Sequence, residues 1–242
     1  MRAQARHQLK QDKFSRTTIQ VAEKTVHWSV EHKSKLIAGA AVVAVATAVV
    51  IFAWYYFDRQ DTRASVDFGK AVQVLDEPVR PAGTPPQPDM PSFTSAEERA
   101  SQARKHFQAI VDRYPHTRAA DFSRYFLGVT AAQLGDHAAA EGDLKEAAGN
   151  HNRELSSLAK LALAGLYRDT NRTSDAAALY KQLIDKPSTT VSKSAARIAL
   201  AETYQSAGMT ADAKKQLEQI QKDAPQSEAA QLATAKLQDL GK

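Results

Sequence analysis

Residues 157–188 read SLAKLALAGLYRDTNRTSDAAALYKQLIDKPS and contain the pattern that decides the fold. The small Ala164 precedes Tyr167 by three residues, and Ala176 precedes a second tyrosine by four. Spacings of three and four residues return to the same face of an α-helix. Asn171 lies between the two stretches and tolerates the left-handed backbone of a tight turn. The segment therefore predicts two antiparallel helices.

The same arrangement recurs along the chain at intervals of 36 or 37 residues. Each copy has an alanine and, four residues later, a large side chain: Ala103 and Phe107, Ala140 and Leu144, Ala176 and Tyr180, Ala213 and Leu217. In three copies a preceding helix carries a second small residue, namely Gly128, Ala164 and Ala201. We expect these small residues to face the repeated alanines, which lets paired helices approach to about 8–10 Å. The turns between paired helices are expected at Gly135, Asn171 and Gly208.

This pattern resembles the tetratricopeptide repeat, whose antiparallel helix pairs stack into a right-handed superhelix. We expect repeats at residues 121–152, 157–188 and 194–225, followed by a capping helix over Glu228–Leu240. The predicted fold class is therefore all-α. It has one N-terminal transmembrane helix followed by a tetratricopeptide-repeat, right-handed helical solenoid.

The first repeat differs because its two expected helices, Asp61–Leu75 and Ala96–Tyr114, are far apart in the sequence. The intervening residues Glu77–Ser95 contain six of the nine prolines, which favours a solvated, semi-extended loop. Two interpretations of this loop stay open, a proline-rich ligand for another protein and an inert insertion.

Leu36–Phe57 is a run of 22 residues without Asp, Glu, Lys, Arg or His. A helix of that length extends about 33 Å, enough for the roughly 30 Å of hydrocarbon in a bilayer. The run ends in bulky residues such as Trp54, whereas a signal-peptide cleavage site has small ones. The sequence therefore predicts an uncleaved signal anchor that contacts membrane lipid through Leu36–Phe57.

Basic residues are concentrated before this span. Residues 1–35 contain eight Lys or Arg against three Asp or Glu, 8 − 3 = +5, which equals the net charge of the whole chain. The positive-inside rule then predicts a cytoplasmic N-terminus and a C-terminal domain across the membrane, which is the periplasm for a bacterial inner (cell) membrane. The balanced charge of the remainder argues against nucleic acid as a partner.

These boundaries predict four segments in the chain. They are a basic cytoplasmic tail at 1–35, a transmembrane signal anchor at 36–57, a leading helix with the proline-rich loop at 58–95, and a repeat domain with its capping helix at 96–242.

A short basic tail, one span and three to four repeats together resemble the ancillary subunit of the bacterial Sec translocon, a family of single-pass membrane-anchored tetratricopeptide repeat proteins. The stretch FQAIVDRYPHTRAADFSRYFLG at Phe107–Gly128 is similar to repeats of the cell-division coordinator and of outer-membrane assembly lipoproteins. The resemblance implies binding to translocon subunits, periplasmic chaperones or exported polypeptides, without enzymatic chemistry. An organiser of envelope or division machinery and an enzyme accessory subunit are the alternatives.

In such arrays the first helix of each pair lines the concave face. Positions two, five and nine of the expected repeats give a largely apolar surface. The candidate protein-binding groove consists of Phe122, Tyr125, Val129, Leu158, Leu161 and Ile198. An extended apolar peptide or a partner helix is the expected ligand. The alternative is that these side chains only pack against neighbouring helices.

Catalytic and metal-binding signatures are missing from the sequence. The chain has no cysteine, no HExxH motif among its seven histidines, no Gly-rich phosphate loop and no GxSxG elbow. We therefore expect no catalytic residue, no metal ligand and no cofactor, and a protein that is not an enzyme.

Overall fold

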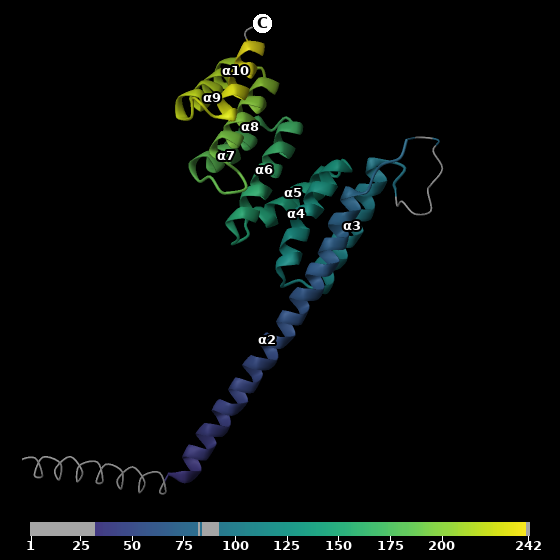
Figure 1. Cartoon of the computed structure of the whole chain (residues 1–242), viewed down its shortest axis with the longest axis vertical. Helices are drawn as coiled ribbons and strands as arrows, with labels where there is room; N and C mark the ends of the chain where they lie inside the picture. Colours follow the sequence, from purple (N-terminus) through teal and green to yellow (C-terminus); the bar gives the residue numbers. More distant parts are fainter. Residues whose placement is uncertain (1–31, 82, 84–91, 241–242) are drawn as a thin grey trace, which may run out of the picture. The chain divides into compact units, whose positions relative to one another are not determined.

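Figure 1 shows the computed structural model of the chain, which describes residues 32–81, 83 and 92–240. The helices in these residues are α2 (Lys33–Asp76), α3 (Ala96–Arg113), α4 (Arg118–Gln133), α5 (His137–Ala148), α6 (Arg153–Asp169), α7 (Thr173–Asp185), α8 (Lys193–Ser206), α9 (Thr210–Asp223) and α10 (Glu228–Asp239). The extended pairing in the described residues is one isolated bridge between Val79 and Phe93. The predicted all-α fold is confirmed, while most of the predicted basic tail, residues 1–31, lies outside the described residues.

The chain divides into two compact units, Met1–Asp58 and Arg59–Lys242. In the described part of the first unit, large apolar side chains of α2 such as Val42, Phe52 and Trp54 are exposed. A stretch of α2 is long and apolar enough to cross a membrane, and none of that stretch is buried. The helix is therefore a candidate membrane span.

The helix α2 is continuous, whereas the sequence suggested a span ending at Phe57 and a separate leading helix beginning at Asp61. Residues 58–60 include neither glycine nor proline, so nothing in their chemistry interrupts the backbone hydrogen bonds of the helix. The later part of α2 belongs to the second unit, where Ala64 and Ala71 are buried.

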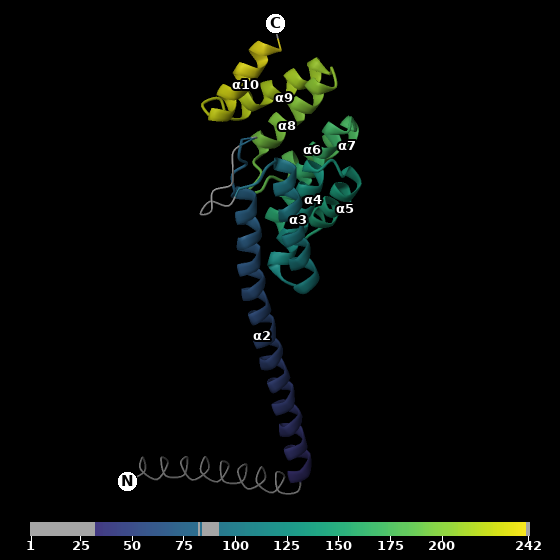
Figure 2. The same cartoon turned by 90° about the vertical axis from the view of Figure 1, so that its right-hand side faces the viewer.

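The second unit consists of helix pairs that stack in chain order from α3 to α10, as Figure 2 shows. Each of these helices packs against the next one along the chain, and α4, α6, α8 and α10 also contact one another in succession. These four helices therefore line one face of a right-handed solenoid. The final helix α10 matches the predicted capping helix to within one residue.

Tight turns reverse the chain between the helices of three pairs. Gly135 and Gly208 have φ angles of 74° and 73°, and Asn171 has a φ of 60°. Most L-residues avoid this left-handed region, whereas glycine occupies it freely and asparagine tolerates it. The predicted turn positions are therefore confirmed.

Small residues bring the helices of each pair together. The predicted contact residues are all buried: Gly128, Ala140, Ala164, Ala176, Ala201 and Ala213. A Cβ atom built at Gly128 would lie 2.6 Å from Cγ of Leu144, which is one helical turn after Ala140. The helices α4 and α5 are therefore too close at this point for any side chain on residue 128.

The first pair is held together by aromatic rings from three helices. Phe107 of α3 is fully buried, and its ring stacks on that of Phe126 of α4 with centroids 4.9 Å apart. Phe68 of α2 lies 5.9 Å from the first ring and 5.8 Å from the second. We call Phe68, Phe107 and Phe126 the aromatic cluster.

The ends of the proline-rich loop are joined to each other. The Arg80 N–H donates to the Phe93 carbonyl at 2.9 Å, and the Phe93 N–H donates to the Pro78 carbonyl at 3.0 Å. The Arg99 guanidinium of α3 also donates to the Glu77 carbonyl at 3.0 Å. The predicted semi-extended conformation concerns mainly residues 82 and 84–91, which lie outside the described residues.

Candidate protein-binding groove

The six predicted groove residues lie on three of the stacked helices that line one face. Phe122, Tyr125 and Val129 belong to α4, Leu158 and Leu161 to α6, and Ile198 to α8. All six side chains are half-buried. Helical spacing places them on one side of each helix, and contacts between α4, α6 and α8 bring the three sets together.

These side chains also take part in packing. Five of them, all except Phe122, pack against the core cluster that extends through α4 to α10. Phe122 contacts the aromatic cluster instead, because its ring lies 6.2 Å from that of Phe68. Each side chain therefore has one part in the core and another part at the surface, and binding through this surface stays a prediction.

The central tyrosine of the groove is in an apolar environment. The Tyr125 ring meets the edge of the Phe126 ring at a centroid distance of 5.2 Å. Burial raises the pKa of the Tyr125 phenol. Its hydroxyl therefore stays neutral at physiological pH, and this part of the groove carries no charge.

A cavity of about 240 Å³ lies between α4, α5 and α6. Its lining includes the apolar residues Val129, Leu144 and Leu166, and Gly165, at which a Cβ atom would meet no other atom within 4 Å. The volume is below the roughly 300–1,000 Å³ that is typical of drug-sized ligands. It suits the insertion of a single apolar side chain. We call this the groove cavity.

Polar groups lie at the edge of the same cavity. The lining also includes Ala132, Ala162 and the exposed residues Gln133, His137 and Asp169. The combination of an apolar base with a few polar groups at the edge is typical of sites that orient a ligand while burying its apolar part.

The face is charged farther along the solenoid. Glu202 of α8 pairs with Arg168 of α6 at 4.0 Å and with Lys236 of α10 at 2.7 Å. These ion pairs link three of the stacked helices. The sequence alone does not reveal these ion pairs, because the pairing of charges 34 residues apart depends on the register between helices.

The described residues offer no candidate metal site, since no group of three or more His, Cys, Asp or Glu side chains in them could hold an ion. His116, His137 and His151 are exposed in turns or at the start of a helix.

Comparisons with known proteins agree with this geometry. A family described as a tetratricopeptide repeat-like domain matches residues 26–182, which is more than half of the chain. A family described as a tetratricopeptide repeat matches residues 195–227. No curated protein and no solved structure matches the chain.

Proposed function

The chain belongs to the tetratricopeptide repeat-like domain family, and we propose that it is a membrane-tethered scaffold that binds an apolar segment of a protein partner. Repeats of this kind support protein–protein interaction in general. The observation that carries the proposal is the groove cavity, which shares Val129 with the six groove residues. An apolar side chain of the partner fills this cavity, and the groove residues cover the segment around it.

The tether is the candidate span in α2. Leu36–Phe57 lies in a bacterial inner membrane, the N-terminal tail is cytoplasmic, and the repeat domain is periplasmic. The excess of positive charge in residues 1–35 supports this orientation. The four segments at 1–35, 36–57, 58–95 and 96–242 are then a tail, an anchor, a connecting region and a binding domain.

The biological role within this proposal is assistance to protein secretion. The short basic tail, the single span and the repeats resemble the ancillary subunit of the Sec translocon. Translocon subunits, periplasmic chaperones and exported polypeptides are therefore the proposed partners. Exported polypeptides expose apolar segments before they fold, which is the chemistry that the groove accepts.

Reporter fusions test the orientation. A reporter that is active only outside the cytoplasm is fused after Lys242 in one strain and before Leu36 in another. We expect activity only from the first fusion, because the positive flank holds the N-terminus in the cytoplasm. Activity from the second fusion alone would overturn the periplasmic assignment.

Site-specific photo-crosslinking in cells tests the groove. A photo-reactive amino acid replaces Leu161 in the groove or Ala178 on the exposed side of α7. We expect crosslinks to translocon subunits or exported polypeptides from position 161 only. Crosslinks to division or outer-membrane assembly proteins would favour the envelope organiser, and crosslinks from position 178 alone would place the binding face elsewhere.

A cavity-filling substitution shows whether the groove cavity takes part. Gly165→Leu fills the open space beside Gly165, and we expect it to lower the crosslinking yield from position 161 by about tenfold, equivalent to about 1.4 kcal/mol. Gly142→Leu is the matched control because Gly142 is an exposed glycine of α5 with equally open surroundings. An unchanged yield in Gly165→Leu would exclude the cavity from binding.

A further inference from the structure

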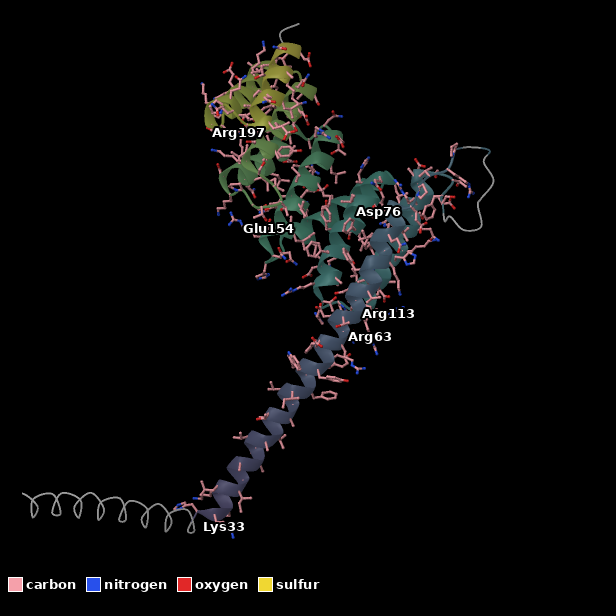
Figure 3. All side chains as sticks on the ribbon, viewed as in Figure 1. Lys33, Arg63, Asp76, Arg113, Glu154 and Arg197 are labelled. Atoms are coloured by element: carbon pink, nitrogen blue, oxygen red, sulfur yellow. The ribbon has the colours of Figure 1, made fainter. Side chains whose placement is uncertain are left out.

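A second cavity, of about 430 Å³, lies between α6 and α7 of the same helix pair. Its lining includes Arg153, Ser157 and Lys160 of α6, and Gln182, Asp185 and Lys186 at the end of α7. None of the six groove residues lines it. We call it the basic cavity. It begins at the first turn of α6, where Figure 3 labels the neighbouring Glu154.

Positive charge predominates in the basic cavity, with three cations against the single carboxylate of Asp185. Lys160 and Lys186 form no ion pair with any residue in the described part of the chain, whereas Lys145, Lys193 and Lys236 do. The carboxylate of the nearby Glu154 forms no ion pair with them either, and it accepts hydrogen bonds from Thr190. The two ammonium groups are therefore available to a ligand.

The guanidinium of Arg153 is already positioned. It donates one hydrogen bond to the Pro187 carbonyl at 2.7 Å, which fixes the side chain at the edge of the cavity. A guanidinium has five N–H donors, so the remaining ones stay free for an anionic group. A positioned cation loses less entropy on binding than a freely rotating one.

Ser157 supplies an independent observation. Ser157 lines the cavity and only 5% of the residue is exposed, but its hydroxyl is not among the buried atoms that lack a partner, so solvent reaches it. The buried Ser123, Thr130 and Thr203 all donate to carbonyls of their own helices. The Ser157 hydroxyl forms no such bond in the described residues, so it can donate to a ligand in the cavity as it does to water.

We propose that the basic cavity binds an acidic peptide segment of a protein partner. Carboxylates accept charge-assisted hydrogen bonds from lysine and arginine and ordinary ones from a serine hydroxyl, which is the donor set present here. The volume lies within the range for ligands of many atoms and exceeds what a single small anion needs. The site lies between the two helices of one repeat, so it is separate from the groove and independent of the proposed function.

Fluorescence anisotropy tests this assignment with a fluorescein-labelled hexaglutamate peptide and the full chain in a nonionic detergent. The variant of the basic cavity, called the pocket variant, is Lys160→Gln/Lys186→Gln. We expect it to weaken hexaglutamate binding by about tenfold, since each exposed charge pair changes affinity by a few-fold. The control variant Lys181→Gln/Lys215→Gln removes the same charge from exposed positions outside the cavity and should stay within about twofold of the parent.

Lys186→Glu provides a second variant at an exposed position, in case the half-buried Lys160 is needed for folding. We expect it to weaken hexaglutamate binding while leaving the melting temperature unchanged. The groove variant Gly165→Leu should bind hexaglutamate like the parent. The experiment therefore tests acidic-peptide binding in the basic cavity separately from apolar-segment binding in the groove.

Three results would overturn the proposal. They are the absence of hexaglutamate binding, equal loss in the pocket and control variants, and displacement of the peptide by orthophosphate at the same concentration as by unlabelled hexaglutamate. The last result would mean that the cavity recognises a small anion and not a peptide.

Discussion

The first helix pair and the third pair are built from the same repeat pattern but are held together differently. In the third pair, α6 and α7 are joined by a tight turn at Asn171, and small residues bring the helices into contact. In the first pair, α2 and α3 are separated by residues 77–95, and aromatic rings fill the space between them and α4. The regular pair depends on contacts close in sequence, and the first depends on contacts between distant segments.

The connections between pairs show a similar contrast. The loop before α8 is fastened by Glu154, whose carboxylate accepts hydrogen bonds from the N–H of Thr190 at 2.9 Å and from its hydroxyl at 3.0 Å. The long loop of the first pair is joined instead by backbone pairing at its ends. In a solenoid each pair contacts mainly its neighbours, so damage to one pair should stay local.

The largest predicted effect is that of Phe107→Ala. Removing a fully buried ring from the aromatic cluster should cost about 3–5 kcal/mol. Because the cluster contains residues of α2, α3 and α4, hydrogen exchange should show lost protection in these helices and retained protection in α8 to α10.

Leu217→Ala is the matched control at the other end of the array, since Leu217 of α9 is also buried. In this variant we expect lost protection in α8 to α10 and retained protection in α2, α3 and α4. Uniform loss along the whole solenoid in both variants would contradict the local character of the contacts.

The regular pairs could be predicted from sequence better than the first one. Their small residues, such as Ala164 and Ala176, and their turn residue Asn171 recur at fixed spacing, and each has a local physical role. The role of Phe126 was not predicted, because its partners Phe68 and Phe107 belong to helices that the long loop separates.

The same reasoning applies to the sites. The half-burial of the predicted groove residues follows from helical periodicity, so their position on one face could be predicted. The two cavities could not be predicted from sequence, because the size and position of a cavity depend on how side chains from several helices pack around it.

A second prediction sharpens the contrast by testing the small-residue contacts. Gly128→Ala should destabilise the fold by about 1–3 kcal/mol, because the added Cβ would meet Leu144 Cγ at 2.6 Å and its backbone nitrogen at 3.1 Å. Gly142→Ala, in open space on α5, should instead stabilise it by about 0.5–1 kcal/mol. Thermal unfolding measures both, and a change of the same sign in the two variants would contradict the close packing of α4 on α5.

A third prediction concerns the turns of the regular pairs. Gly208→Ala should cost about 1–2 kcal/mol, because φ is 73° and a Cβ atom is unfavourable in the left-handed region. Asn171→Gly, at a φ of 60°, should change the unfolding free energy by only a few tenths of a kcal/mol, since both residues tolerate this conformation. Urea unfolding midpoints compare the two, and an equal loss in both would indicate that the side chain of Asn171 has another role.

The smallest predicted effect is a pH dependence at the loop fastened by Glu154. Hydrogen bonds from Thr189 and Thr190 lower the pKa of Glu154 from 4.5 to about 2. The carboxylate therefore contributes stability above a pH of about 4.5, and this contribution is lost as the pH falls toward about 2.

Glu154→Gln lacks the titrating group, so the parent should be the more stable protein at neutral pH. The difference in unfolding free energy should then shrink as the pH is lowered. Other acidic groups titrate in both proteins and cancel from this difference. Urea unfolding at a series of pH values measures it, and a gap that stays constant down to pH about 2 would show that the Glu154 hydrogen bonds do not fasten the loop.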